Sequence, residues 1–136
     1  MDSRQGWRTL VEATFLFRNI GYIMRMWMID PAKLCRKHLL GEHGELHKFL
    51  PSFVKKFKVA NRVSPIVQIE LSSYKKRHDE LAIEMLKRGM NHKSPINKLP
   101  DFSYLPQNHY NAKVNIENSI KDLKQRCNHC KELLEE

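Results

Sequence analysis

Residues 38–47 read HLLGEHGELH, and this stretch decides the fold because its apolar positions recur with a helical period. At about 100° per residue, Leu39, Leu46 and Leu50 fall on one stripe of a helix. The polar side chains lie on either side of that stripe. The stretch therefore predicts an amphipathic helix that faces a core, and it makes a helical fold the starting expectation.

The polar residues of this helix raise the question of a metal site or an acid/base site. His38, Glu42 and Glu45 form a row beside the leucine stripe, whereas His43 and His47 flank its other side, so the five groups do not converge within the helix. Their order also differs from the zinc-protease helix, in which His-Glu-x-x-His brings two imidazoles together. The pattern leaves a carboxylate row at the edge of an apolar face.

The first helix has a recognisable start. Asp30 can cap a helix and Pro31 fits its first position, so the helix is predicted to run from there to about Pro51 and to resume through Phe53 and Phe57. Residues 59–68 contain a proline and no helical stripe, which predicts a connector.

Two further helices follow the same period. The second carries apolar or aromatic positions at steps of three and four, with Gly89 as a left-handed cap: Leu71, Tyr74, His78, Leu81 and Met85. The third is marked by Ala112, Ile116, Ile120, Leu123 and Cys127. Three prolines in residues 90–110 predict a long loop between them. The expected fold is all-α, a compact three-helix single domain with long connecting loops.

Length and charge restrict the class of protein. A chain of 136 residues predicts one domain, and its formal charge of +9 favours a polyanionic partner, with nucleic acid ahead of an anionic membrane surface. No apolar run approaches the roughly 18 residues of a membrane span. We expect a monomer without a membrane association, in the cytoplasm or at the nucleoid, or a virus-encoded protein acting in the host cytoplasm.

The cysteines predict neither a disulfide framework nor a metal site. Their odd number, three, fits a reducing compartment. Cys127-x-x-Cys130 supplies half of a zinc site, to which His129 or Cys35 would have to contribute, but structural zinc normally uses two such pairs. Both thiols also fall on one face of the predicted third helix, where small apolar residues are common. The expectation is no bound metal and no cofactor.

Residues 1–23 differ from the rest of the chain. They form a loosely amphipathic pattern without the features of a secretory signal, which predicts a docked or frayed helix. Met24 is an alternative translation start, in which case the cell never makes this extension. The predicted organisation is an N-terminal extension of uncertain status, 1–23, and a helical domain, 24–136.

Basic residues gather near the ends of the predicted helices. The clusters are Lys33, Arg36 and Lys37; Lys55, Lys56, Lys58 and Arg62; Lys75, Lys76 and Arg77; and Lys87, Arg88, Lys93 and Lys98. Each cluster alone is typical of a solvated face. Together they predict a surface that follows the phosphates of DNA without selecting a sequence.

Two stretches carry a resemblance to a known family. From Met24 onward the chain resembles the phage-type pyrimidine-dimer DNA glycosylases, the endonuclease V type. The first helix matches through His38-Leu39, Glu42 and Glu45-Leu46, and the second through the run K-R-x-x-E-L-x-x-E-x-L-K-R-G-x-N-x-K over residues 76–93. The resemblance covers roughly residues 24–126 and is weak after Lys98.

This resemblance implies a reaction. The family has a compact three-helix fold and removes cyclobutane pyrimidine dimers from double-stranded DNA. The amine of its mature N-terminus attacks the deoxyribose, and the imine that results undergoes β-elimination. The residue aligned with that nucleophile is Met24, and the supporting glutamate aligns with Glu45. An α-amine with a pKa near 8 and a carboxylate beside the sugar suit these steps.

The resemblance and the basic clusters together give the remaining site residues. Glu42 is expected to support Glu45, and the expected contacts with DNA are Arg25, Lys37, His38, Lys48, Arg77, Lys87, Arg88 and Lys93. Gly44 replaces an arginine of the family, so one contact is missing.

Two departures keep a second hypothesis open. Met24 is internal in this chain, so its nitrogen becomes a nucleophilic amine only if translation starts there or the extension is removed. The C-terminus lacks the family's aromatic-rich segment, which weakens the assignment to pyrimidine dimers. The alternative is a non-catalytic DNA-binding module that kept the basic surface.

Overall fold

The computed structural model describes residues 25–136, so Met24 and the predicted helix within residues 1–23 lie outside the described part. The three longest helices are α1 (Arg36–Lys48), α4 (Tyr74–Lys87) and α6 (Ile116–Arg126). Shorter elements are η2 (Pro31–Lys33), α2 (Leu50–Val54), α3 (Ala60–Val63), η3 (Leu71–Ser73), α5 (Gln107–Tyr110) and α7 (Asn128–Leu134). No strand occurs among the described residues, and the predicted all-α fold with three principal helices is confirmed.

The first predicted helix is divided into three pieces. Asp30 caps the 3-10 turn η2, its carboxylate accepting a hydrogen bond of 3.0 Å from the Ala32 amide, and α1 begins only at Arg36. At the other end α1 stops at Lys48, and α2 carries Pro51 in its first turn. Proline lacks the amide hydrogen for the helical bond to His47 and its ring crowds that carbonyl, which explains the break.

The end of α4 agrees with the prediction. Gly89 adopts a φ of 81°, a left-handed conformation that favours glycine. The Gly89 amide donates to the Leu86 carbonyl and the Met90 amide to the Met85 carbonyl, each at 3.0 Å. These two bonds form a Schellman cap that satisfies carbonyls at the helix end.

The third predicted helix begins and ends differently. Asn115, rather than a residue near Ala112, caps α6 through a 3.0 Å bond from the Asn118 amide. Cys127 is extended, with φ −143° and ψ 114°, and separates α6 from α7. The prediction that Cys127 and Cys130 share one face of a continuous helix is therefore wrong.

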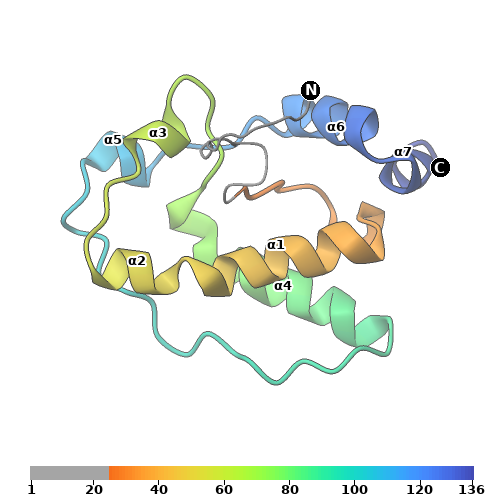
Figure 1. Ribbon diagram of the computed structural model, residues 1–136, viewed down its shortest axis with the longest axis horizontal. Helices are drawn as coiled ribbons and strands as arrows, with labels where there is room; N and C mark the ends of the chain where they lie inside the picture. Colours follow the sequence, from red (N-terminus) through yellow and green to blue (C-terminus); the bar gives the residue numbers. More distant parts are fainter. Residues whose placement is uncertain (1–24) are drawn as a thin grey trace, which may run out of the picture.

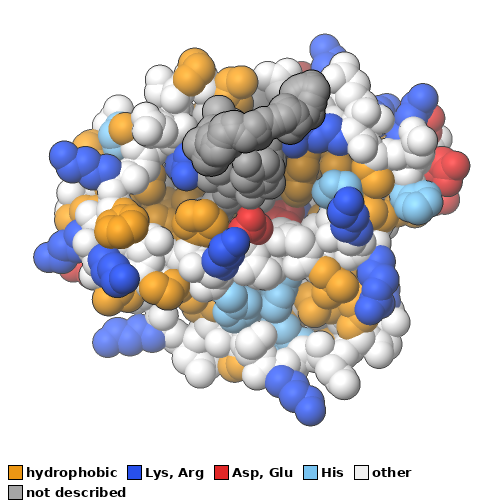
Figure 2. Space-filling view, in the orientation of Figure 1, with side chains coloured by type: hydrophobic (Ala, Val, Ile, Leu, Met, Phe, Trp, Pro, Cys, Tyr) orange, Lys and Arg blue, Asp and Glu red, His pale blue; other side chains and the backbone are white. Residues whose placement is uncertain are grey.

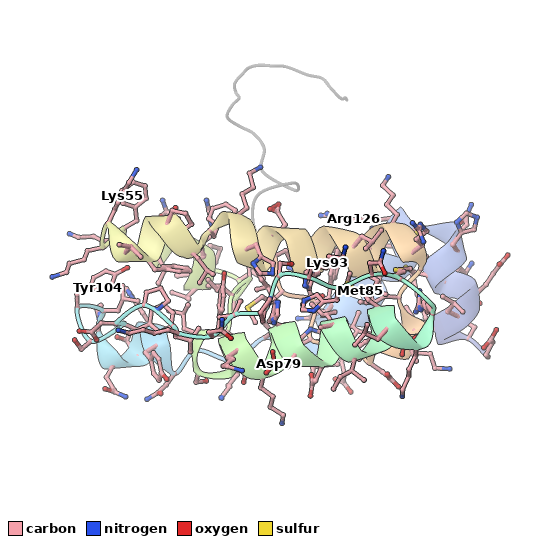
Figure 3. All side chains as sticks on the ribbon, turned by 90° about the horizontal axis from the view of Figure 1, so that it is seen from below. Lys55, Asp79, Met85, Lys93, Tyr104 and Arg126 are labelled. Atoms are coloured by element: carbon pink, nitrogen blue, oxygen red, sulfur yellow. The ribbon has the colours of Figure 1, made fainter. Side chains whose placement is uncertain are left out.

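The core lies between α1 and α4, which run side by side, while α7 follows α6 and packs against η2, just before the start of α1 (Figure 1). Leu39 and Leu46 of the predicted stripe are fully buried against it. The Tyr74 hydroxyl donates to the Leu46 carbonyl and joins the two helices. The long loop after α4 runs past these helices (Figure 3). It adds buried Phe102, whose ring meets that of Phe53 edge to face.

The segment before η2 fixes the start of the described chain inside the fold. The Met26 amide donates to the Gln68 carbonyl at 2.8 Å, and Met26, Trp27 and Ile29 are buried. The buried residues that follow Arg25 hold it between α1 and α6. No helix in the described range is both long and apolar enough to span a bilayer.

Candidate active site

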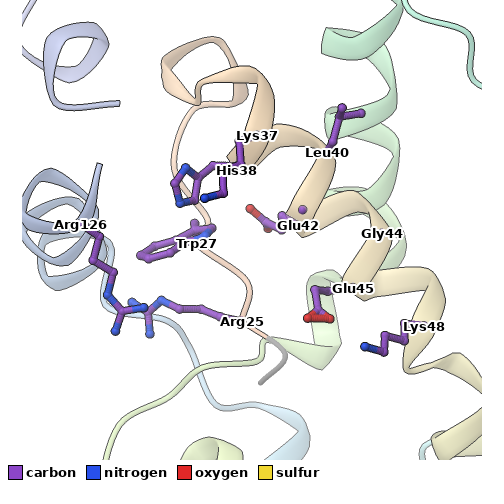
Figure 4. Close-up of a pocket in the computed structure, with 11 residues that line it drawn as sticks. Arg25, Trp27, Lys37, His38, Leu40, Glu42, Gly44, Glu45, Lys48 and Arg126 are labelled. Carbon is purple, nitrogen blue, oxygen red and sulfur yellow. The ribbon is translucent and has the colours of Figure 1, made fainter. Parts of the chain in front are cut away.

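A cavity of about 580 Å³ opens between α1, the segment at Arg25 and the end of α6. Its lining combines cations with two carboxylates and an aromatic ring: Arg25, Trp27, Lys37, His38, Leu40, Gly41, Glu42, Gly44, Glu45, Lys48 and Arg126. In Figure 4, Arg25 and Arg126 lie on one side of it, whereas Glu45 and Lys48 come from α1 on the other. The cavity thus brings together several of the residues predicted from sequence.

Glu45 is the carboxylate of this cavity that forms no ion pair with another residue of the described part of the chain. Its side chain is half-buried, and one oxygen, Oε2, is buried without a hydrogen-bond partner among the described residues. Burial raises the pKa of Glu45 above its usual value, and the charge of Lys48 opposes part of that rise. An unpaired carboxylate whose pKa is shifted toward neutrality is suited to accept and return a proton.

Glu42 is committed to an ion pair inside the protein. Arg77 of α4 donates to both of its carboxylate oxygens, at 2.7 and 2.9 Å, and also to the Ile29 carbonyl at 2.7 Å. Both side chains are almost inaccessible to water. The prediction that Arg77 contacts DNA is wrong, because a buried guanidinium with three occupied bonds cannot reach a phosphate.

Arg25 lies at the cavity, held by polar and aromatic contacts. Its guanidinium donates to the Ser119 hydroxyl at 3.0 Å, lies 3.9 Å from the Asp122 carboxylate, and stacks 4.4 Å from the Trp27 ring centroid. Its Nε is buried without a partner among the described residues. A cation held in this way is positioned for an anion such as a phosphate.

Trp27 and Arg126 also line the cavity, although neither was predicted from the sequence to belong to the site. The Arg126 guanidinium lies 5.9 Å from the centroid of the Trp27 ring, although Arg126 and Trp27 are far apart in the sequence. An aromatic residue two positions after Arg25 was a weak local signal for Trp27. No local signal exists for Arg126, because only folding brings the C-terminal helix to this wall.

The other predicted cations differ in how they are placed relative to the cavity. Lys37 and Lys48 are exposed at the cavity, as a phosphate contact requires, whereas Lys87 and Lys93 are exposed outside its lining. Arg88 is half-buried, because it pairs with Glu84 at 2.8 Å and donates to the Pro31 and Leu34 carbonyls. The structure gives Arg88 a role in joining α4 to η2 and does not favour the predicted DNA contact.

His38 also lines the cavity, but its Nδ1 atom faces two thiols. The distances from Nδ1 are 3.3 Å to the Cys35 sulfur and 3.6 Å to the Cys130 sulfur. The imidazole of His38 also packs edge to face against the Trp27 ring, with 6.0 Å between the two ring centroids.

The comparison with known families identifies the family to which the chain belongs. A family model described as pyrimidine dimer DNA glycosylase matches residues 24–98, more than half of the chain. The chain belongs to the pyrimidine dimer DNA glycosylase family. No curated protein and no solved structure matches it. The family supports the assignment to DNA repair and to glycosylase chemistry on a DNA substrate.

The matched range contains Gly44, where the resemblance implied an arginine. A Cβ atom at this helical position would meet nothing within 4 Å, so a larger side chain has room there. The cavity therefore lacks this contact because of the residue type and not because of crowding.

Proposed function

We propose that this glycosylase excises pyrimidine dimers from duplex DNA and cuts the strand through an imine formed by the α-amine of Met24. The proposal requires translation from Met24 or removal of residues 1–23. Its main support is the position of Glu45, a half-buried carboxylate in a cavity bordered by cations, whose Oε2 atom has no hydrogen-bond partner within residues 25–136. Arg25, the residue that follows Met24 in sequence, lines the same cavity.

The reaction proceeds by two bond-breaking stages. In the first, the Met24 nitrogen bonds to C1′ of the damaged nucleotide and gives up a proton, while the glycosidic bond breaks and the base takes up its electrons and a proton. The sugar ring then opens to an imine, O4′ taking a proton. In the second, Glu45 accepts the C2′ proton, and the C3′–O bond breaks to release the 3′ phosphate. A positioned acid/base group of this kind typically contributes ~10²–10⁴-fold to a rate.

The cations of the cavity bind the strand on both sides of the damaged nucleotide. Arg25 and Arg126 form one wall and Lys37 and Lys48 the other, so phosphates flanking the lesion meet positive charge as the sugar approaches Glu45. Contacts of this type position DNA without selecting a sequence. Selection of the lesion has to come from the shape of the cavity.

Borohydride trapping on abasic DNA tests the amine directly, because only an imine is reduced to a stable covalent adduct. Arg25 is too bulky for ordinary removal of an initiator methionine, so protein that starts at Met24 presents its α-amine and should be trapped. Full-length protein with an intact Met1 should be trapped poorly. Equal trapping of both forms would identify a lysine as the nucleophile and overturn this assignment.

A second candidate function follows from the internal position of Met24. If the mature protein retains residues 1–23, the Met24 nitrogen is an amide, and the cavity serves a DNA-binding module without lyase activity. Intact-mass measurement of native protein distinguishes the two, because the catalytic form must begin at Met24.

A further inference from the structure

Four potential metal ligands meet beside the cavity. The thiol cluster consists of Cys35 and His38 at the start of α1 and Cys127 and Cys130 at the junction of α6 and α7. One ligand atom from each residue lies within 4.8 Å of all the others. Cys130 is fully buried, so the cluster is closed to bulk water on that side.

The distances within the thiol cluster fit a tetrahedral zinc ion. Zinc bonds of about 2.3 Å to sulfur and 2.0–2.1 Å to nitrogen imply roughly 3.8 Å between two sulfur ligands and roughly 3.6 Å between sulfur and nitrogen. The sulfur atoms of Cys35 and Cys127 are 3.8 Å apart. The His38 Nδ1 atom lies 3.3 and 3.6 Å from the sulfur atoms of Cys35 and Cys130.

Backbone amides also point at the sulfur atoms. The Cys130 amide donates to the Cys127 sulfur at 3.4 Å, and the Cys35 amide donates to the Cys130 sulfur at 3.2 Å. Such bonds stabilise the thiolate form, which is the form that binds zinc. One Cys-x-x-Cys pair supplies only two zinc ligands, and the tertiary structure brings two more, Cys35 and His38, beside that pair.

We propose that the thiol cluster binds one structural zinc ion through three cysteines and a histidine. With four protein ligands the site is closed, so the ion stabilises the fold and takes no part in the reaction. It ties the α6–α7 junction to the start of α1. Because Arg126 immediately precedes Cys127, the same bond network holds this arginine at the cavity wall.

Zinc content of the full chain, purified without chelator, tests this proposal independently of the glycosylase reaction. Cys35→Ser and His38→Gln should each remove about one equivalent of zinc per chain. The matched control is His129→Gln, because His129 lies between the two cysteines of the pair but is exposed. Unchanged zinc in the Cys35 variant, or equal loss in the His129 control, would overturn the assignment.

Cobalt substitution of the unmutated chain keeps the proposal testable if the variants do not fold. Replacement of zinc by Co²⁺ should give a thiolate-to-cobalt charge-transfer band in the near ultraviolet, together with the visible bands of tetrahedral cobalt. Absence of the charge-transfer band in cobalt-loaded protein would exclude thiolate ligands. Removal of the metal by a chelator should lower the melting temperature.

A second group of ligands rests on different observations. The histidine cluster comprises His43 and His47 of α1, His78 of α4 and His92 of the following loop, each with one ring nitrogen within 4.8 Å of the others. Histidine side chains are visible together near the middle of the face in Figure 2. His43 is buried, and the Nε2 atoms of His43 and His92 have no hydrogen-bond partner in the described part of the chain.

The orientation of His78 also suits a metal ligand. Its Nδ1 atom lies 3.0 Å from the Asp79 carboxylate, and its Nε2 atom shares a hydrogen bond of 2.9 Å with Nε2 of His47, so both Nε2 atoms point into the cluster. A carboxylate behind a histidine fixes the ring and increases the basicity of the opposite nitrogen, an arrangement common around bound metals. Four imidazoles suit a borderline divalent ion such as zinc.

We infer that the histidine cluster binds a second divalent ion, which joins α1, α4 and the loop after α4. Full-length protein should then contain about two equivalents of zinc, of which His43→Gln removes one and Cys35→Ser the other. His129→Gln again serves as the control that loses neither. This second inference would be overturned if the unmutated protein contained only one equivalent of zinc per chain and His43→Gln retained it.

Discussion

Glu45 is the residue on which the proposed chemistry depends, and Glu45→Gln isolates its contribution. The amide retains the shape of the side chain but removes the charge and the base, so strand cleavage should fall by ~10²–10⁴-fold. Binding to damaged DNA should be equal or tighter, because a negative charge near phosphates is lost. Single-turnover cleavage and equilibrium binding on the same duplex measure both effects.

Glu132→Gln is the matched control for that substitution, because Glu132 is an exposed glutamate of α7. It should cleave at the rate of the unmutated protein. Cleavage near the full rate by Glu45→Gln would mean that the family alignment is misplaced in α1.

The raised pKa of Glu45 also predicts a pH dependence of stability. Because the pKa is higher in the folded state than in the unfolded chain, folding favours the protonated carboxyl. The stability that this group contributes is present below its unfolded pKa and is lost as the pH rises through the folded value. At neutral pH, Glu45→Gln should therefore melt at a higher temperature than the unmutated protein. Equal melting temperatures at neutral pH would contradict the shift.

At the scale of the helices, the Glu42–Arg77 pair joins α1 to α4 in the core. Glu42→Gln leaves a buried guanidinium without its counter-charge, which should cost about 3–5 kcal/mol in the free energy of unfolding. Urea denaturation followed by circular dichroism measures this loss. Any reduction in cleavage should follow from unfolding, whereas Glu45→Gln reduces cleavage in a folded protein.

The exposed pair Lys75–Asp79, at 2.7 Å, is the control for the buried one. Lys75→Gln should change stability by no more than about 1 kcal/mol, because solvent screens the charges. If Glu42→Gln lowered the free energy of unfolding by as little as Lys75→Gln does, the buried pair would contribute little to stability.

Two glycines at helices predict opposite effects of the same substitution. Gly44→Ala in α1 should stabilise the protein by roughly 0.5–1 kcal/mol, because alanine favours a helix and the added carbon meets no atom within 4 Å. Gly89→Ala should destabilise it by about 1–2 kcal/mol, because its φ of 81° strains any residue with a Cβ atom. Thermal unfolding of the two variants is the measurement. Effects of the same sign would contradict the cap assignment.

For the whole molecule, the charge of +9 predicts strongly salt-dependent binding to duplex DNA. About five phosphate contacts should give a slope of roughly −4 to −5 in a plot of log affinity against log salt concentration. Lys37→Gln, at the cavity, should reduce the magnitude of the slope by about 0.9. Lys113→Gln, whose amine donates to the Ser72 hydroxyl, is the control. A slope near zero would remove both the catalytic and the binding hypothesis.

The helices and the resemblance to a family could be predicted from the amino-acid sequence, because each depends on residues close together in the chain, and the net charge follows from composition alone. The period of Leu39 and Leu46 gave α1, and the glycine after a helical run gave the cap of α4. The candidate carboxylate Glu45 was also found from sequence, through the spacing of the family motif. Boundaries such as that near Pro51 were displaced by a few residues, because competing local bonds decide where a helix ends.

Which polar groups meet depends on how the helices pack and could not be predicted from the sequence. Glu42 and Arg77 are 35 positions apart, and His38 and Cys130 are 92 apart, so no local pattern indicates either contact. Packing of α1 against α4 converted a predicted DNA contact into a buried ion pair. The packing of α6 and α7 near the start of α1 places Arg126 at the cavity. It also brings Cys127 and Cys130 to Cys35 and His38, which gives four potential metal ligands in one place. Helical periods are encoded by neighbours in sequence, whereas a site depends on which faces of distant helices the core brings together.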